Sequence, residues 1–391
     1  MPTTQRKVAL LIETARGYGR GLLRGIVRYS RLHGPWAFYI TPGDFAQALP
    51  EMKQWGGTGI LARLETPALA DAVLATGLPV IALDLSDAQL APGSPLADLA
   101  EVRSDSPGAA RMAADHLLDR GFRQYAFVGV AHRVWSRRRR EGFGARLAEA
   151  GFDCRVYPLP RRRRDREWGR EQATLADWLR DLPKPVGLMA CNDDRGRQVL
   201  EACRAAGVQV PEEVAVIGVD NDDLLCDLSA PPLSSVALNT ERGGFEAAAL
   251  LDDLMAGRAP APRRIVVEPL GVVTRQSTDV LAIQDREVSA ALRFIRDHAD
   301  RPIQVADLVA EAGLSRRALE MRFRKAVGRS IHQEIERVHL ERAKRLLAET
   351  DAPIDRVAEA SGFSGASYLS QIFRRRIGMT PARYRRHVRT R

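Results

Sequence analysis

Short apolar runs alternate with longer amphipathic stretches over residues 7–280. These runs are rich in Val, Ile, Leu and aromatic side chains and are bounded by polar or glycine residues, a pattern typical of β-strands. The runs that predict strands are KVALLI (7–12), WAFYI (36–40), GILAR (59–63), PVIALD (79–84), YAFVGV (125–130), VGLMAC (186–191), VAVIGVD (214–220) and RIVVEP (264–269).

Helical patterns lie between these runs, with apolar residues three and four positions apart. Each ends in glycine, the residue that most often terminates a helix. The clearest are GRGLLRGIVRYSRLHG (19–34), SPGAARMAADHLLDRG (106–121), FGARLAEAG (143–151) and GRQVLEACRAAG (196–207). This alternation predicts an α/β fold with parallel sheets that helices cover on both faces.

The α/β part divides into two halves, over about 7–100 and 120–235, which later segments tie together. Two lobes joined by crossing segments form a cleft, and ligands of open α/β sheets sit at the carboxyl ends of strands. The polar residues that end the predicted strands are therefore the first candidates for ligand contacts. We place this two-lobed domain at residues 1–278 and a second domain at 279–391.

The second domain shows no strand pattern and contains a helix-turn-helix signal over about 304–326. The helix VADLVAEA is followed by Gly313, which can adopt the positive φ of a tight turn. Ser315 then suits the N-cap of a second helix, RRALEMRFRKAV. The same pattern recurs over about 354–376, where IDRVAEAS precedes Gly362 and a helix that carries Leu369 and Phe373.

Positive charge is concentrated in the same region. Residues 284–391 contain 23 Lys and Arg against 14 Asp and Glu, a net charge of +9 in a chain of net charge +10. A basic module on a neutral body is typical of nucleic-acid binding, with a solvated basic tail as the alternative. The arginine-rich run at 161–166 lies in an expected loop and is interpreted as solvated surface.

Two recognition helices held by one connecting helix can enter successive major grooves of double-stranded DNA. The run AEASGFSGASYLSQIFRRRIGMTPARYRR (358–386) resembles the signature of the AraC-type DNA-binding domain. The resemblance implies base-reading side chains at Arg316, Arg317, Glu320, Ala366, Ser367, Ser370 and Gln371. Other arginines suit phosphates, which set affinity and salt dependence. These are Arg374, Arg375, Arg376, Arg385 and Arg386. Arg324 lies on the outer face of the first recognition helix and is a further candidate for DNA contact.

The first domain resembles the sugar-binding core of LacI-type repressors, which shares the periplasmic-binding-protein fold. Four segments carry this resemblance, at 102–129, 136–147, 190–221 and 231–255. Candidate ligand contacts follow a predicted strand or fall on these segments: Asp105, Trp135, Arg139, Asn192, Asp193, Asp220 and Asn239. A structural role is the alternative for three of them: an N-cap for Asp105, a turn for Asp220 and packing for Trp135. Tyr18 and Arg20 are candidates to reach the ligand or a partner subunit.

Carboxylates, amides and guanidinium groups pair with adjacent sugar hydroxyls, while an aromatic ring covers the apolar face. A LacI-type sensor followed by an AraC-type DNA-binding domain resembles the xylose-operon regulator family. The resemblance implies D-xylose as effector, a homodimer, an RNA polymerase contact and transcriptional activation. Other pentoses, hexoses and sugar acids use the same residue types and stay open as effectors.

Several other functions are disfavoured by missing motifs. Cys154, Cys191, Cys203 and Cys226 have neither metal-site nor disulfide-framework spacing, so we expect no metal or other cofactor and a reducing, cytoplasmic location. No apolar run is long enough to span a membrane. GYGRG (17–21) lacks the dinucleotide-binding spacing, and no hydrolase or phosphate-loop motif appears, so we expect no enzyme. A ligand-independent dimeric DNA binder remains the second alternative.

Overall fold

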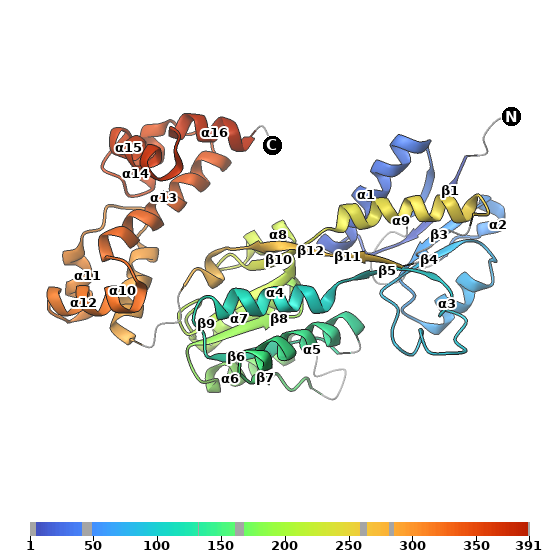
Figure 1. The fold of residues 1–391 in the computed structure, drawn as a ribbon, viewed down its shortest axis with the longest axis horizontal. Helices are drawn as coiled ribbons and strands as arrows, with labels where there is room; N and C mark the ends of the chain where they lie inside the picture. Colours follow the sequence, from blue (N-terminus) through green and yellow to red (C-terminus); the bar gives the residue numbers. More distant parts are fainter. Residues whose placement is uncertain are drawn as a thin grey trace. The chain divides into compact units, whose positions relative to one another are not determined.

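The computed structural model describes residues 5–40, 49–131, 133–160, 168–258, 264–280 and 285–389. The arginine-rich run at 161–166 falls outside these residues. The chain divides into two compact units, Met1–Val280 and Leu281–Arg391. The first unit holds two α/β lobes and the second is helical (Figure 1), which confirms the predicted fold class.

The first lobe is built on a parallel sheet with strand order β11-β5-β4-β3-β1-β2. Its strands are β1 (Lys7–Leu11), β2 (Ala37–Ile40), β3 (Gly59–Ala62), β4 (Val80–Leu83), β5 (Ala100–Ser104) and β11 (Arg264–Val267). Its helices are α1 (Gly17–His33), α2 (Met52–Trp55), α3 (Pro67–Leu74) and α9 (Thr240–Met255). Strands β3 and β4 are buried at every residue because α3 covers one face of the sheet and α1 and α9 cover the other.

Helices α1 and α9 pack closely although more than 200 residues separate them (Figure 1). Glycines make this approach possible. A Cβ atom on Gly25 would lie 2.0 Å from the Glu241 carbonyl oxygen, and one on Gly244 would lie 2.0 Å from the Leu22 carbonyl oxygen. Only hydrogen fits at these positions, so the sequence of α1 is matched to a helix near the end of the unit.

The second lobe has strand order β12-β10-β9-β8-β6-β7, parallel except for the antiparallel pair of β10 and β12. Its strands are β6 (Gln124–Val128), β7 (Cys154–Val156), β8 (Val186–Ala190), β9 (Val214–Asp220), β10 (Ser234–Leu238) and β12 (Pro269–Val273). Its helices are α4 (Ser106–Leu118), α5 (Val134–Glu149), α6 (Trp168–Asp181), α7 (Asp193–Ala206), α8 (Asp223–Leu228) and the 3₁₀ helix η2 (Gln276–Thr278).

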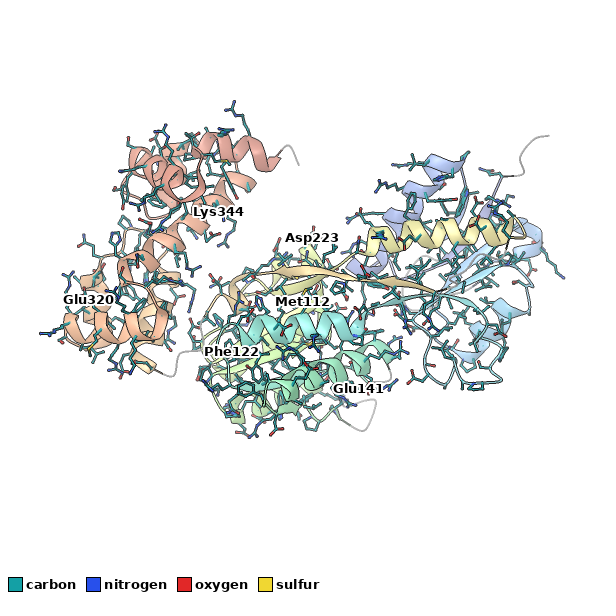
Figure 2. All side chains as sticks on the ribbon, viewed as in Figure 1. Met112, Phe122, Glu141, Asp223, Glu320 and Lys344 are labelled. Carbon is teal, nitrogen blue, oxygen red and sulfur yellow. The ribbon has the colours of Figure 1, made fainter. Side chains whose placement is uncertain are left out.

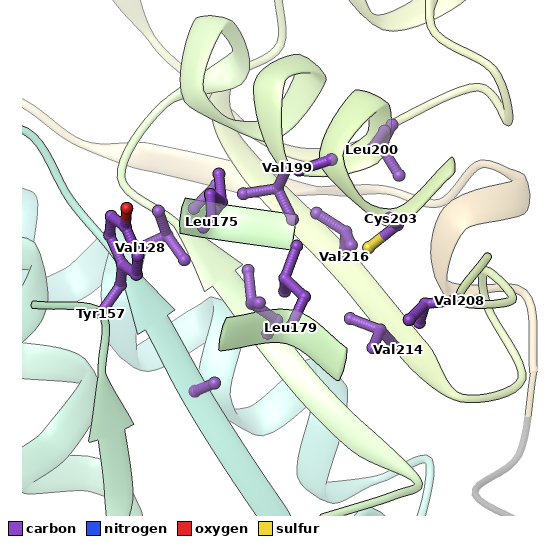
Figure 3. Close-up of a cluster of buried hydrophobic side chains, with 14 of the residues drawn as sticks. Val128, Tyr157, Leu175, Leu179, Val199, Leu200, Cys203, Val208, Val214 and Val216 are labelled. Carbon is purple, nitrogen blue, oxygen red and sulfur yellow. The ribbon is translucent and has the colours of Figure 1, made fainter. Parts of the chain in front are cut away.

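One face of this second sheet carries a continuous apolar core. Figure 3 shows side chains of α6 and α7 meeting those of β6 and β9 there, among them Val128, Leu175, Leu179, Val199, Cys203 and Val216. Burial of such side chains supplies most of the favourable free energy that holds the lobe together.

Three segments cross between the lobes, after β5, after β10 and between β11 and β12. The third crossing corrects the expectation of a single strand over 264–269. That apolar run ends one sheet at Val267, crosses at Glu268 and begins the other sheet at Pro269. The strands of the two sheets follow the same topological order. Strand β4 is third in the first sheet and β9 is third in the second, so these two strands are equivalent.

The second unit contains α10 (Arg286–Asp297), α11 (Val305–Ala312), α12 (Arg316–Val327), α13 (Ile331–Glu349), α14 (Ile354–Ala360), α15 (Ala366–Ile377) and α16 (Pro381–Arg389). Both predicted helix-turn-helix units form. Gly313 and Gly362 have φ of 62° and 75°, and the Ser315 hydroxyl caps α12 by accepting from the Ala318 amide. Each pair of helices has its own apolar core, around Phe323 in the first and Phe373 in the second.

Candidate ligand and DNA sites

A pocket with about 430 Å³ of empty space lies at the carboxyl ends of both sheets. The first lobe supplies side chains that follow β1, β3, β4 and β5, and the second supplies side chains from α5 and from the ends of β8 and β9. The lining residues are Glu13, Arg16, Tyr18, Gly19, Arg63, Asp84, Ser104, Arg133, Trp135, Arg139, Asn192 and Asp220. The pocket is therefore where a two-lobed α/β sensor is expected to hold its ligand.

An ion-pair network forms the wall on the first lobe. Arg63 pairs with Glu13 across 2.8 Å and with Asp84 across 3.0 Å, and all three side chains are largely buried. Burial is the largest single effect and raises the pKa of Glu13, but the Arg63 charge together with hydrogen bonds from the backbone and from Arg63 outweighs it, so the pKa is lowered. The other Asp84 oxygen accepts from the Ser104 amide at 3.1 Å, so this wall is rigid and charged before any ligand binds.

A second network forms the opposite wall. Arg139 donates to Asp220 at 3.0 Å and to the Cys191 carbonyl at 2.5 Å, and its guanidinium lies 5.2 Å from the centre of the Trp135 ring. Burial raises the pKa of Asp220, and Arg139 only partly offsets this effect. Asn192 completes the wall at the first turn of α7, where its side-chain oxygen accepts from the Arg195 amide at 3.0 Å.

Apart from Arg63 Nε, which lies 2.8 Å from Glu13 in an ion pair, two buried polar atoms of the lining have no hydrogen-bond partner within the described residues: the Tyr18 hydroxyl and the Arg139 Nε. Tyr18 is 8% exposed and Arg139 is 2% exposed. Burial, together with the nearby Asp84 carboxylate, raises the pKa of Tyr18 well above its usual value, so this hydroxyl keeps its proton. An unpaired buried polar group is costly, and these two groups fit a pocket that a polar ligand completes.

Four of the seven predicted ligand contacts line the pocket: Trp135, Arg139, Asn192 and Asp220. The structure does not bring the other three to its lining. Asp105 caps α4 by accepting from the Gly108 amide at 2.9 Å, and Asn239 lies at a crossing where its backbone amide donates to the Glu268 backbone carbonyl. Asp193 turns into the second lobe and accepts from the Ser235 hydroxyl at 2.6 Å.

Sequence reasoning did not select several lining residues, although its own rule could have found three of them. Arg63 and Asp84 end the predicted strands GILAR and PVIALD, where polar strand-end residues were expected to matter. Glu13 directly follows the predicted strand KVALLI and meets the same rule, whereas Arg16 and Arg133 lie in connecting loops that carry no such signal. Tyr18 does reach the pocket, whereas Arg20 pairs with Asp222.

The first predicted recognition helix, α12, buries one stripe and exposes the other. Leu319 and Phe323 are fully buried, and Arg316, Arg317, Glu320 and Arg324 are exposed. Figure 2 shows Glu320 on this helix, where it pairs with Arg316 at 2.9 Å. Met321 is 66% exposed on the same side of α12, and sequence reasoning did not select it.

The second predicted recognition helix, α15, presents an open groove. Its lining consists of Ala366, Ser367, Ser370, Gln371, Arg374 and Arg375, six of the residues that the sequence assigned to DNA. Glu336 on α13 pairs with Arg375 at 2.5 Å and with Arg376 at 2.8 Å. Arg385 donates to the Ala352 carbonyl. These three arginines therefore also hold the helices of this unit together.

The described residues contain neither a candidate metal site nor a candidate membrane-spanning helix. No cluster of three or more His, Cys, Asp or Glu side chains suited to a metal ion occurs among them. No helix in the described part of the chain combines the length and apolar character needed to cross a membrane. The four cysteines are free thiols.

Known protein families match successive parts of the chain. The XylR N-terminal domain matches residues 7–94, the periplasmic binding protein-like domain matches 114–278, and a helix-turn-helix domain matches 308–387. The fold of the first unit is shared with a transcriptional regulator CelR–cellobiose complex, with a TM-score of 0.55, 24% identity and coverage of 70% of this chain and 86% of that one.

Full-length relatives are transcription regulators, not enzymes. The xylose operon regulatory protein of Escherichia coli K12 is 31% identical over 98% of both chains, and that of Haemophilus influenzae is 31% identical over 97% of this chain and 98% of the relative. The structure of the xylose-binding transcription activator XylR superposes with a TM-score of 0.79, 29% identity and 99% coverage of both chains. The chain therefore belongs to the family of xylose operon regulatory proteins, sugar-responsive regulators with an AraC-type DNA-binding domain.

Proposed function

We propose that the chain is a transcription activator whose effector is D-xylose, bound in the pocket between the two lobes. The observation that carries this proposal is the lining itself: charged side chains from both lobes surround the Tyr18 hydroxyl and the Arg139 Nε, which have no hydrogen-bond partner among the described residues. A polyhydroxylated ligand can donate to and accept from such groups, whereas an apolar ligand would leave them unpaired.

Each wall offers a carboxylate next to a guanidinium, Asp84 with Arg63 and Asp220 with Arg139. We infer that each pair binds adjacent hydroxyls in a fork, with the carboxylate accepting and the guanidinium donating. The Trp135 ring is suited to the apolar face of the sugar. The other three predicted contacts affect sugar binding indirectly in this proposal, because they support the segments that carry the pocket residues. They are Asp105, Asp193 and Asn239.

The charges of the pocket favour a neutral sugar over a sugar acid. Every arginine of the lining already has an acidic partner: Arg63 and Arg139 pair within the pocket, Arg16 pairs with Asp194 at 2.9 Å, and Arg133 pairs with Glu65. A ligand carboxylate would have to displace one of these pairs, whereas neutral hydroxyls can join them.

For the DNA response, we propose that residues 1–278 form the sensor and residues 279–391 the DNA-binding domain of a cytoplasmic homodimer that contacts RNA polymerase. Base edges are read from α12 and α15, and Arg324, Arg374 and Arg375 lie near phosphates. Because only a ligand that prefers one conformation can shift an equilibrium, the sugar must bind the closed lobes more tightly than the open ones.

A thermal-shift screen tests the ligand assignment. The panel contains D-xylose, L-arabinose, D-ribose, D-glucose and D-xylonate. At about one hundred times the Kd, linkage stabilises the folded protein by about 2.7 kcal/mol, which raises Tm by several degrees. We expect D-xylose to give the largest shift and D-xylonate to give none. If no pentose raises Tm, the D-xylose proposal is wrong; if D-xylonate alone does, the effector is a sugar acid.

A further inference from the structure

We propose that Asp222 is a positioning residue that holds the lobes in the ligand-binding arrangement by capping helix α1 from the opposite lobe. The proposal rests on the proposed sugar-binding function and adds a residue outside the pocket lining. Asp222 follows β9 in the second lobe, and α1 belongs to the first lobe.

Helix α1 has no side-chain cap of its own. Its N-cap residue, Arg16, makes no capping hydrogen bond. The Gly17 amide instead donates to Asp222 Oδ2 at 2.7 Å. An aspartate carboxylate at a helix N-terminus satisfies a free amide and interacts favourably with the helix dipole, which is the role that a local N-cap residue normally fills.

Arg20, one turn further along α1, donates to the other Asp222 oxygen at 2.7 Å. The Asp222 side chain is 3% exposed, whereas Arg16 and Asp194, which pair across the same lobes, are 45% and 38% exposed. Exposed pairs are screened by water and contribute little, but removing one partner of a buried pair leaves an uncompensated charge. Asp222 therefore contributes more to lobe association than the exposed pair.

Hydrogen bonds within the second lobe hold Asp222 in place. Its amide donates to Asp193 Oδ2 at 2.7 Å, and the other Asp193 oxygen accepts from the Ser235 hydroxyl. This arrangement gives Asp193 a role although it lies outside the pocket: it holds the Asp222 backbone in the position from which the Asp222 side chain contacts α1.

The cap links lobe closure to the pocket. The first turn of α1 carries Tyr18 and Gly19, both of which line the pocket, and Asp220 precedes Asp222 by two residues on the facing wall. Separation of the lobes would break the contact of Asp222 with α1 and, at the same time, move Tyr18 away from the facing wall of the pocket. Sugar affinity should therefore depend on the cap, because apparent affinity scales with the population of the binding-competent state.

Gly17 provides an independent way to weaken the cap. A Cβ atom there would lie 2.9 Å from the Asp222 Cβ, and the three nearest atoms all belong to Asp222. The φ of Gly17 is not in the left-handed region, so alanine suits the backbone. Gly17→Ala should therefore disturb only the contact between the lobes.

The experiment measures D-xylose binding by calorimetry to the full chain and to Asp222→Ala, Asp222→Asn and Gly17→Ala. The controls are Gly144→Ala, whose Cβ meets nothing within 4 Å, and Asp223→Asn, an exposed neighbour shown in Figure 2. We expect Asp222→Ala and Gly17→Ala to raise Kd about tenfold or more, since loss of a charge-assisted cap is of that order. Asp222→Asn should give a smaller rise because asparagine still accepts from the Gly17 amide.

The sugar-free Tm separates positioning from general stability. We expect the sugar-free Tm of both cap variants to match that of the controls, because each lobe keeps its own core. Kd values within twofold of wild type would overturn the proposal, and so would a fall in sugar-free Tm that parallels the loss of affinity. If wild type binds no pentose, the proposed function fails instead.

Discussion

Asp84 and Asp220 end equivalent strands of the two sheets, and both have a left-handed backbone, with φ of 47° and 106°. Non-glycine residues rarely adopt this conformation, and strain of this kind concentrates at functional sites. Each aspartate also pairs with a buried arginine of its own lobe, Arg63 or Arg139. The pocket therefore has two similar walls, one from each lobe, that face a common ligand.

The carboxylate of Asp220 should be needed for sugar binding. In Asp220→Asn the side chain keeps its shape, and asparagine tolerates positive φ, so the lobe should fold. The loss of one charge-assisted hydrogen bond costs about 2 kcal/mol, which raises the Kd for D-xylose roughly thirtyfold. Calorimetric titration measures this effect, and an unchanged Kd would remove Asp220 from the ligand site.

The contact between α1 and α9 should not tolerate a methyl group. In Gly25→Ala the new Cβ would lie 2.0 Å from the Glu241 carbonyl oxygen, so the helices must move apart. Overpacking of this kind costs about 1–3 kcal/mol. We expect urea denaturation of Gly25→Ala to show this loss in the free energy of unfolding, whereas Gly144→Ala should match wild type. Equal stability of the two variants would mean that the helices pack less closely than described.

The salt dependence of DNA binding should distinguish side chains of α15 that read bases from those that contact phosphates. Gln371→Ala should weaken binding to a selected DNA site by about 1–3 kcal/mol and relax the preference at one base pair. Arg374→Ala should weaken binding to all sequences alike and lower the salt slope by about one. Fluorescence anisotropy over about 50–200 mM salt distinguishes them. The same loss on every sequence for Gln371→Ala would assign this residue to the backbone.

The exposed thioether of Met321 should contribute an apolar contact on α12. An unpaired apolar side chain among charged neighbours suits the thymine methyl group in a major groove. Met321→Ala should therefore reduce the affinity for a DNA site that has thymine at the contacted position. The affinity for an otherwise identical site that lacks this thymine should not change. A loss that is equal on both sites would contradict base contact.

Acid should weaken the first unit through His116. Burial, aided by the Arg120 charge, lowers the pKa of this ring from 6.5 to about 3. Between these values the unfolded chain binds the proton that the folded ring excludes, so the free energy of unfolding falls as pH drops below about 6.5. His116→Gln retains a donor for Thr278 but cannot titrate, and its Tm should depend less on pH in this range. Identical pH profiles for the two proteins would exclude His116 as the cause.

Most of the architecture could be predicted because its signals are local. Apolar runs located the buried strands, and Gly313 with Ser315 located a turn and a helix start that form as predicted. The strands that were not predicted are β5, β7, β10 and β12. Strand β5 contains Glu101 and Arg103, β10 begins with two serines, and β7 has three residues, so none of these three shows a continuous apolar run.

The residues of the candidate pocket were harder to predict from the sequence, because the pocket depends on distances between the two lobes. Asp105 and Asp193 follow strands as Asp220 does, yet one caps its own helix and the other bonds to Ser235. No spacing in the sequence distinguishes an aspartate that faces the cleft from one that faces the interior. The pairing of Arg20 with Asp222 likewise joins residues 202 positions apart and could come only from the structure.

The most direct test of this account is the affinity of the full chain for its operator DNA with and without D-xylose, measured by fluorescence anisotropy alongside Asp220→Asn. We predict tighter operator binding by wild type when the sugar is present and, at the same sugar concentration, a much smaller change for the variant, because its Kd for D-xylose is about thirtyfold higher. An operator affinity that is the same with and without D-xylose in wild type would contradict it.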